Sequence, residues 1–182
     1  MKHPSQRVGI FIDAANMYHS AKNLHGARLN FKAVVEAAVA GRQLIRAIAY
    51  VIKTKTGEEK PFFDALEAAG IEIKEKELQE FYSGAKKADW DVGIAVDAIR
   101  IGDVLDAVVL ASGDGDFYPL LEYLKNQGRQ VEVMSFRETT SSHLLEIVDD
   151  FVDLSADKKR FLFPMARPKR GMIIRGNNKI EV

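Results

Sequence analysis

The sequence predicts an α/β fold, a three-layer α/β/α sandwich in which helices cover both faces of a central, mainly parallel sheet. Short apolar runs alternate along the chain with segments of helical periodicity, and several of these runs contain no polar residue. Uninterrupted apolar strands indicate burial on both faces, which a parallel sheet between two helix layers provides. The length of 182 residues suits one such domain.

Five strands and a short sixth are expected. The first is the run VGIFI at 8–12, and the last is a short segment at 151–154. The segment 71–78, IEIKEKEL, alternates apolar and charged residues, which predicts a more exposed strand near an edge of the sheet. The remaining strands are expected at 44–52, 105–111 and 130–135.

Helices are expected between these strands. Asn30 precedes the periodic segment FKAVVEAAVA and is a candidate N-cap, while Gly41 follows it as a stop. Pro61 suits the first turn of a helix that runs to Ala69. Further helices are expected at 88–101, 117–126 and 141–148.

The composition excludes several classes of protein. The chain has no cysteine, which rules out disulfides and thiolate metal sites and is typical of the reducing cytoplasm. Its first apolar run is five residues long and ends at Asp13, so neither a signal peptide nor a membrane span is expected at the start. We therefore expect a cytoplasmic protein that does not act at a membrane.

Acidic residues follow two of the predicted strands directly. Asp13 comes after the first strand, and the motif ASGDGDFYPLL places Asp114 and Asp116 after the fourth. In an open parallel sheet the ligand crevice lies beyond the carboxyl ends of the strands, so neighbouring strands would bring these acids together. Crowded carboxylates repel one another unless a cation neutralises them. Helix capping by Asp13 or Asp116 would explain either residue alone, but both strand ends together favour a metal site.

A fourth acid, Asp91, lies near the start of the helix expected at 88–101. Four apolar residues at helical spacing are expected to face the core: Val92, Ala95, Val96 and Ile99. Asp91 would border this face. An ordinary surface ion pair with Lys87, four positions earlier, explains Asp91 equally well. Asp89 is expected to be an N-cap or a solvent-exposed acid.

Three segments, VGIFIDAANMYHS, KKADWDVGIAVDAI and VVLASGDGDFYPLLEYLKNQGRQVEVMSF, resemble the NYN domain family in its bacterial LabA-like branch. The resemblance covers residues 7–154. It implies a PIN-like fold and a ribonuclease that hydrolyses RNA phosphodiester bonds. It also implies that Mg²⁺ or Mn²⁺ is bound by four residues, Asp13, Asp91, Asp114 and Asp116. Asn16 would assist them. Trp90 departs from the small or aliphatic residue common in the family, which indicates a local packing change or a stacking surface.

The residue types suit this chemistry, because carboxylate-held Mg²⁺ ions activate water and stabilise the leaving oxygen of a phosphodiester. Asn16 can add a neutral ligand or orient a water, and Ser112 can bond a carboxylate or a phosphate. Thr139 and Ser141, after the fifth strand, can contact phosphate at a helix N-terminus or act as plain caps. Single-stranded RNA is the expected partner, since exposed aromatic residues near the acids would stack on unpaired bases.

The charge is unevenly distributed between a domain at 1–154 and a tail at 155–182. The tail carries eight basic and two acidic residues, a net charge of +6, and the domain carries 18 basic and 24 acidic residues, a net charge of −6. The tail either holds an RNA backbone or packs as an arm or subunit contact, so a homodimer is one alternative. An amphipathic membrane helix is disfavoured by Pro164, Pro168 and Gly171.

Two rival functions remain from the sequence. One is a non-catalytic RNA-binding or regulatory module that keeps the same fold. The other is a phosphatase of the haloacid dehalogenase type, which needs two aspartates separated by one residue after the first strand. The sequence there is Asp-Ala-Ala-Asn, so the phosphatase is disfavoured.

Overall fold

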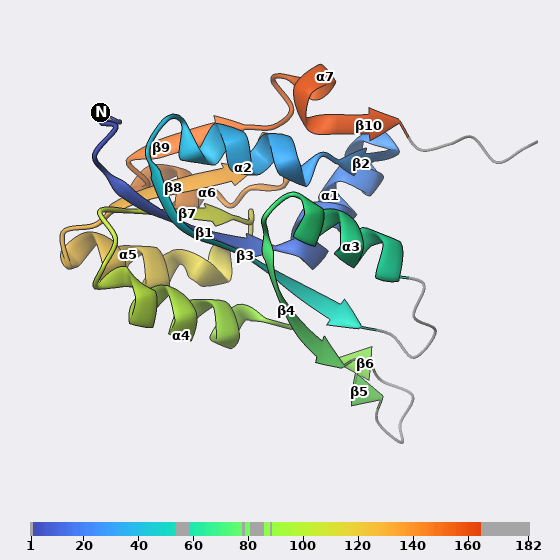
Figure 1. Cartoon of the computed structure of the whole chain (residues 1–182), viewed down its shortest axis with the longest axis horizontal. Coiled ribbons are helices and arrows are strands. Elements are labelled where there is room, and N and C mark those ends of the chain that lie inside the picture. The colour runs from blue at the N-terminus through green and yellow to red at the C-terminus, as the bar shows by residue number, and fades with distance from the viewer. Residues whose placement is uncertain (1, 54–58, 78, 81–85, 88, 165–182) are drawn as a thin grey trace, which may run out of the picture.

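The computed structural model describes residues 2–53, 59–77, 79–80, 86–87 and 89–164 (Figure 1). At its centre lies a six-stranded sheet in the order β4-β3-β1-β7-β8-β9, in which every strand pairing is parallel. The strands are β1 (Arg7–Asp13), β3 (Gln43–Lys53), β4 (Glu72–Glu77), β7 (Ala107–Ala111), β8 (Gln130–Ser135) and β9 (Asp150–Asp153). The predicted fold class is confirmed, and β4, which lies within the range 71–78 where a strand was expected, is at an edge of the sheet as predicted.

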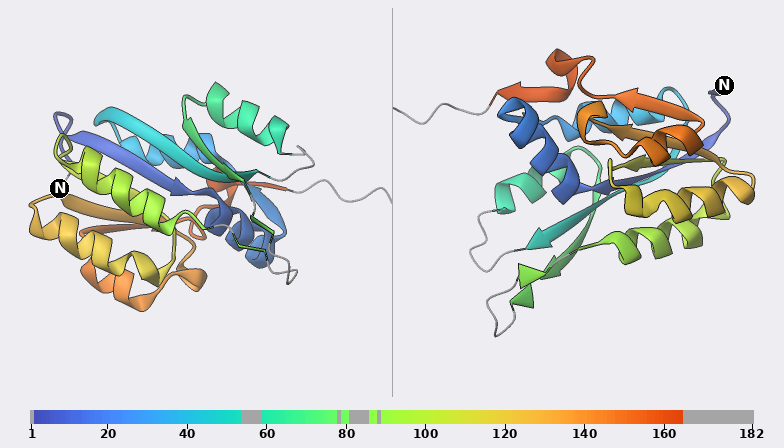
Figure 2. Two further views of the ribbon diagram at one scale, coloured as in Figure 1. Left: turned by 90° about the horizontal axis from the view of Figure 1, so that it is seen from below. Right: turned by 180° about the vertical axis from the view of Figure 1, so that it is seen from behind.

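Helices cover both faces of this sheet, as the views in Figure 2 show. One layer contains α1 (Ala14–His25), α2 (Phe31–Val39), α3 (Lys60–Ala68) and α7 (Lys158–Phe161). The other contains α4 (Asp91–Gly102), α5 (Tyr118–Asn126) and α6 (Ser142–Ile147). Alternate residues of β1 serve the two layers, because Ile10 and Ile12 face the first layer and Phe11 faces the second.

The centre of the sheet is the pair β1 and β7, whose register places Ile12 opposite Ala111. From β1 the chain proceeds outward through β3 to β4, and from β7 it proceeds the other way through β8 to β9. The strand order therefore reverses between β1 and β7, which is where open parallel sheets bind ligands. This confirms the expectation that the strand before Asp13 and the strand before Asp114 and Asp116 are neighbours.

The helix ends test several of the expected caps. Asn30 caps α2 by accepting a hydrogen bond from the Ala33 backbone N–H at 3.2 Å, and Pro61 lies in the first turn of α3. Asp89 was expected as an N-cap of α4 or as a solvent-exposed acid, and the first alternative is wrong because this helix begins later. Its N-cap residue is Trp90, which makes no side-chain capping bond.

The buried face of α4 differs from the expected one. Val92 is 74% exposed, and Val96 and Ile99 are also exposed. The residues that face the core are Ile94 and Ala98, together with the buried acid Asp97. The prediction failed because the true core stripe contains a carboxylate, which accepts hydrogen bonds from Tyr50 and Lys74 on neighbouring strands.

The chain after β9 packs on the domain as far as Pro164. Phe161 is 3% exposed and belongs to the core, and its carbonyl oxygen accepts a bond from the Asn30 N–H at 2.8 Å. Strand β10 (Leu162–Pro164) pairs antiparallel with β2 (Ala27–Leu29). No local pattern predicted β2, α7, β10 or the small hairpin of β5 (Gln79–Glu80) and β6 (Lys86–Lys87), and α1 was implied only by the capping role considered for Asp13. Residues 165–182 of the predicted tail lie outside the described residues.

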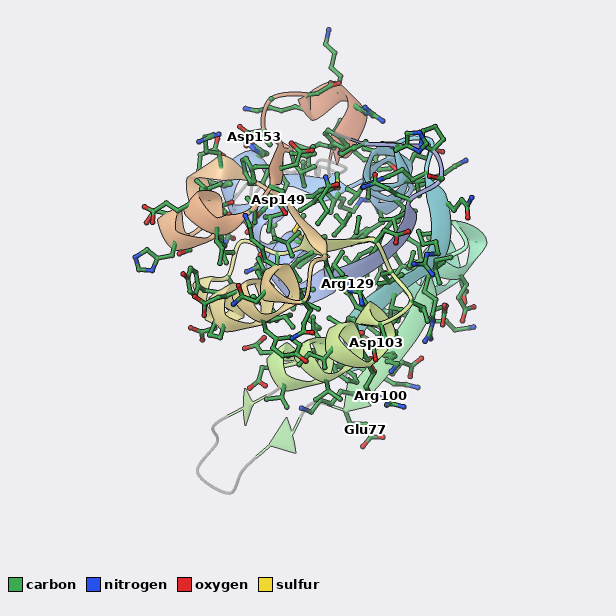
Figure 3. The ribbon with its side chains drawn as sticks, turned by 90° about the vertical axis from the view of Figure 1, so that its left-hand side faces the viewer. Glu77, Arg100, Asp103, Arg129, Asp149 and Asp153 are labelled. Carbon is green, nitrogen blue, oxygen red and sulfur yellow. The ribbon has the colours of Figure 1, made fainter. Side chains whose placement is uncertain are left out.

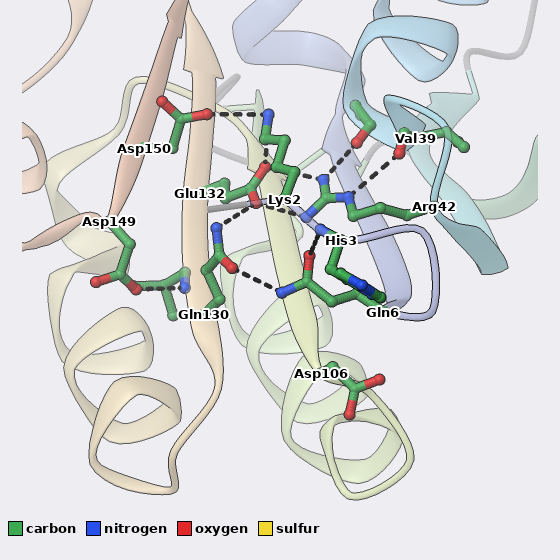
Figure 4. A network of polar contacts seen from close by, with 12 residues as sticks. Lys2, His3, Gln6, Val39, Arg42, Asp106, Gln130, Glu132, Asp149 and Asp150 are labelled. Atoms are coloured by element: carbon green, nitrogen blue, oxygen red, sulfur yellow. Dashed lines mark hydrogen bonds and ion pairs between the residues drawn. The ribbon is translucent and has the colours of Figure 1, made fainter.

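A buried ion pair holds the edge of the sheet where the strands begin (Figure 4). Arg42 and Glu132 form two hydrogen bonds of 2.6 and 3.0 Å, and their side chains are 0% and 1% exposed. Arg42 also donates to the carbonyl oxygens of Ala38 and Val39, at the end of α2. Lys2 lies 3.2 Å from Glu132, so the first residues of the chain join the same network.

Arg129 performs a similar role beside this edge (Figure 3). Its guanidinium donates to the carbonyl oxygens of Leu105 at 2.8 Å and Asp103 at 3.5 Å. These bonds join the connection after α4 to the connection after α5. Both polar networks lie at the edge of the sheet where the strands begin, opposite to Asp13. Their role is therefore to stabilise the fold.

Candidate metal centre

Asp13 is both the last residue of β1 and the N-cap of α1. One carboxylate oxygen, Oδ1, accepts a hydrogen bond from the Asn16 backbone N–H at 3.0 Å. The other, Oδ2, accepts from the Ser112 hydroxyl at 3.4 Å. Capping therefore uses one oxygen of Asp13, and the second faces the loop that follows β7.

The loop after β7 is held by its own polar groups. The buried Ser112 hydroxyl accepts from the Asp114 N–H at 3.2 Å, and the Gly113 N–H donates to the side-chain oxygen of Asn16 at 3.2 Å. Asp114 caps the short 3₁₀ helix η1 (Gly115–Phe117) by accepting from the Asp116 N–H at 3.0 Å. The capping role considered for Asp116 is therefore wrong, because Asp114 performs it and α5 begins at Tyr118 without a side-chain cap.

Two glycines let this loop approach the segment after β8. A Cβ atom on Gly113 would lie 2.7 Å from the Thr139 carbonyl oxygen and 2.8 Å from the Ser135 hydroxyl, so a side chain does not fit. A Cβ atom on Gly115 would lie 2.9 Å from the Ser141 hydroxyl. These glycines were not predicted as site residues, although their alternation with aspartates in GDGD was an available signal.

Thr139 and Ser141 border the loop. The Ser141 N–H donates to the Gly113 carbonyl oxygen at 3.0 Å, and its side chain makes no capping bond to α6. The Thr139 hydroxyl donates to Ser20 at 3.1 Å. These contacts hold the loop in place, and the Ser141 N–H is already used within the protein.

Three carboxylates meet at this place and form the acidic cluster, Asp91, Asp114 and Asp116. Each offers one oxygen, and these oxygens all lie within 4.8 Å of one another, a spacing that one shared cation can bridge. Asp91 reaches the cluster from the first turn of α4. The side chain of Lys87, the alternative partner of Asp91, lies outside the described residues.

Electrostatics relates Asp13 to the cluster. Burial raises the pKa of Asp13, and the negative charges of Asp91 and Asp114 raise it further, against the lowering effect of the Asn16 N–H. Burial likewise raises the pKa of Asp91, with additional repulsion from Asp114, Asp89 and Asp116. A divalent cation would reverse both shifts, because it favours the charged carboxylates.

The raised pKa of Asp13 predicts the behaviour of the variant Asp13→Asn. A raised folded-state pKa contributes stability below the unfolded value of about 3.9, and this contribution is lost as the pH rises through the folded value. At neutral pH the buried charge is therefore unfavourable, whereas asparagine keeps the acceptor for the Asn16 N–H. We expect Asp13→Asn to raise the melting temperature of metal-free protein at pH 7, with no such gain well below pH ~4.

The control for this measurement is Asp157→Asn, because Asp157 caps α7 in the same way, accepting from the Arg160 N–H, and lies away from the cluster. The control should show no stabilisation at pH 7. Equal melting temperatures for the Asp13→Asn variant and the wild-type protein at pH 7 would contradict the repulsion inferred here.

The family to which the chain belongs is shown by a match to a family model over most of its length. The model of the NYN domain matches residues 7–155. The chain belongs to the NYN domain family. NYN domains are a PIN-like nuclease family whose members are typically ribonucleases, so the resemblance and the fold predicted from the sequence are both confirmed.

Two similar proteins cover nearly the whole chain. The low amplitude and bright protein LabA of Synechococcus elongatus is 28% identical over 172 residues, which is 90% of this chain and 91% of LabA. A crystal structure of a protein of unknown function from Vibrio parahaemolyticus has a TM-score of 0.80 and 29% identity, covering 90% of this chain and 99% of that one. The similarity to LabA therefore extends over more residues than the match to the NYN domain model.

Within the described part of the chain, no helix combines the length and apolar character needed to cross a bilayer.

Proposed function

We propose that this protein is a cytoplasmic ribonuclease that hydrolyses phosphodiester bonds of single-stranded RNA, using Mg²⁺ or Mn²⁺ held by its acidic residues. The observation that carries the proposal is the acidic cluster, three carboxylates within 4.8 Å at the point where the strand order of a NYN domain reverses. Clefts at this point of an open parallel sheet are ligand sites. The site occurs in a family of nucleases, which makes RNA the favoured substrate.

The donor set fits a hard divalent cation. Asp91, Asp114 and Asp116 supply three carboxylate oxygens. Asp13, whose Oδ2 accepts from Ser112 in the loop before Asp114, would be a fourth ligand. Such an ion, when bound, stabilises negative charge on a phosphate and lowers the pKa of its water. Burial, together with repulsion from the neighbouring carboxylates, raises the pKa of Asp13 and Asp91, and perturbed carboxyl groups of this kind are typical of functional sites.

The neighbouring polar residues support the acids. Ser112 donates to Asp13 and accepts from the Asp114 N–H, so one hydroxyl joins the ends of β1 and β7. The Asn16 side-chain oxygen holds the Gly113 N–H, which fixes the loop, and the amide nitrogen of Asn16 can donate to a phosphate oxygen. Thr139 and Ser141 act through the same loop.

A non-catalytic RNA-binding module on the same fold is the second candidate. Such a module does not require four acids near one another, since carboxylates repel RNA unless a cation is bound. The acid set is complete in this chain, and this favours catalysis. The phosphatase alternative lacks support, because Ala15 occupies the position where that class needs its second aspartate.

The test is incubation of the purified protein with fluorescently labelled single-stranded RNA and DNA, with Mn²⁺, with Mg²⁺ and with a chelator. We expect RNA cleavage that requires the metal and is inhibited by the chelator, and the Asp13→Asn variant should be inactive. Metal-independent RNA binding without cleavage would contradict the proposed enzymatic activity and favour the non-catalytic RNA-binding module. Cleavage that survives Asp13→Asn would indicate a contaminating nuclease.

The basic tail gives a separate prediction. Truncation from Lys158 would remove Phe161 from the core, so the informative truncation is after Pro164, which removes residues 165–182 with five basic residues and one acidic residue. If this segment contacts phosphates, its removal should weaken RNA binding and flatten the dependence of affinity on salt concentration. Filter binding at several salt concentrations measures both, and an unchanged salt slope would contradict the phosphate contacts.

A further inference from the structure

We infer that Trp90 is a positioning residue for Asp91: its indole ring fixes the first turn of α4 against the central sheet and thereby sets where the Asp91 carboxylate meets Asp114 and Asp116. This inference rests on the proposed function, since it assigns the geometry of the same metal site to a residue outside the carboxylate set. It follows from contacts around Trp90 on three elements.

The indole ring is attached to β3. Its Nε1–H donates to the Val51 carbonyl oxygen at 2.9 Å, and Val51 is 2% exposed. The ring also packs edge-on against Tyr50, with ring centroids 5.3 Å apart. Tyr50 is itself fixed, because its hydroxyl donates to the buried Asp97 of α4 at 2.8 Å. The ring therefore joins the start of α4 to a strand that pairs directly with β1.

The ring also lies on the first turn of its own helix. A Cβ atom on Gly93 would come within 2.5 Å of the indole Cε3 and 2.8 Å of Cζ3, so the space beside the glycine is filled by the ring. Glycine inside a helix is unfavourable relative to alanine, and the close approach of the ring explains its presence here. The Trp90 carbonyl oxygen accepts the Ile94 N–H at 2.7 Å and closes this turn.

Lys76 of β4 holds the residue before the ring. Its ammonium donates to the Asp89 carbonyl oxygen at 2.8 Å and lies 5.7 Å from the centroid of the Trp90 ring. Helix α4 has no side-chain N-cap bond. Its start is therefore defined by contacts with β3 and β4, and Asp91 is the next residue after the one that makes them.

This arrangement matters for metal binding because Mg²⁺ tolerates little deviation from its preferred geometry. Residues that orient metal ligands without touching the metal typically change its affinity by about 10- to 100-fold when they are replaced. Displacing the indole ring would move the first turn of α4, and with it the Asp91 oxygen, relative to the loop that carries Asp114 and Asp116. We expect a loss of affinity of about tenfold or more.

The test uses two single variants and one control. Gly93→Ala forces the ring away, and Trp90→Phe keeps an aromatic ring but removes the bond to Val51. Gly102→Ala is the matched control at the other end of α4, where a Cβ atom would meet only the flexible Leu124 side chain at 3.2 Å. Calorimetry gives the Mn²⁺ dissociation constant of each protein, and the melting temperature without metal reports whether it folds.

A spectroscopic readout is available because Trp90 is the only tryptophan of the chain. Mn²⁺ is paramagnetic, so binding next to Asp91 should quench Trp90 fluorescence in the wild-type protein, with a midpoint equal to the calorimetric constant. In the Gly93→Ala variant the midpoint should shift to higher Mn²⁺ concentration by the same factor. A purely structural role for the ring would lower the melting temperature and leave this midpoint unchanged.

A double variant distinguishes displacement of the ring from a general effect of alanine. In Trp90→Val/Gly93→Ala the ring is absent, so the alanine should cost no further affinity beyond that of Trp90→Val alone. Mn²⁺ affinities of Gly93→Ala and Trp90→Phe equal to that of the wild-type protein would overturn the inference. If Gly93→Ala does not fold, Trp90→Phe decides the question. A wild-type protein that binds no Mn²⁺ would overturn the proposed function and this inference together.

Discussion

Replacing Asp114 with asparagine is expected to lower the rate of metal-dependent RNA cleavage by at least a hundredfold. Asp114 is a member of the acidic cluster, and its charge adds to the effect of burial in raising the pKa of Asp13 and Asp91. A bound metal supplies several kcal/mol of charge stabilisation to the transition state, and each ~1.4 kcal/mol lost is about tenfold in rate. The measurement is the single-turnover rate of RNA cleavage at saturating Mn²⁺.

The Asp114→Asn variant should retain its fold. Asparagine keeps the acceptor for the Asp116 N–H that begins η1, and it removes one of the crowded charges. Its melting temperature without metal should therefore be no lower than that of the wild-type protein. The control is Asp103→Asn, an exposed acid at the other end of α4, which should keep full activity. An Asp114→Asn variant as active as this control would remove Asp114 from the site.

The second large effect concerns stability. Glu132→Gln removes one partner of the buried pair and leaves the Arg42 guanidinium charged in the interior, at 0% exposure. Breaking a buried ion pair in this way costs about 3–5 kcal/mol. In a protein of this size each kcal/mol shifts the melting temperature by about 2–4 °C, so a decrease of roughly 6–20 °C is expected. Thermal unfolding followed by circular dichroism measures it.

Two further measurements separate this effect from the site. Mn²⁺ affinity of the Glu132→Gln variant should equal that of the wild-type protein at temperatures where both are folded, because Glu132 lies near the start of β8 and the acidic cluster lies beyond the ends of the strands. The double variant Arg42→Met/Glu132→Leu should recover much of the lost stability, since no buried charge remains unpaired. A melting temperature unchanged by Glu132→Gln would show that the pair contributes little to folding.

The sequence predicted the sheet and the acidic residues at the ends of two neighbouring strands, because both depend on local signals. The uninterrupted apolar runs that became β1 and β7 indicate burial on two faces, and their ends are marked by Asp13 and the GDGD motif. Parallel neighbours then place both ends at one edge of the sheet. The position of Asp91 near them came from the family resemblance, because its helical pattern alone allowed an ion pair with Lys87.

The remaining features depend on tertiary contacts that no local pattern encodes. Asp97 is buried because Tyr50 and Lys74, on strands far from it in the sequence, supply its hydrogen bonds, so the apolar stripe of α4 was assigned to the wrong face. The contact between Trp90 and Gly93 requires the indole to reach Val51 on β3. Strand β10 forms only because β2 offers it an edge.

The central claim, that the acidic cluster holds a divalent cation, is tested most directly by anomalous diffraction from crystals soaked in Mn²⁺. We predict an anomalous peak between Asp91, Asp114 and Asp116, bonded to their oxygens at about 2.1 Å as for hard divalent cations of this size, with Asp13 oriented toward it. The peak should be absent from crystals of the Asp114→Asn variant. A map without a peak at these carboxylates after soaking in millimolar Mn²⁺ would contradict the claim.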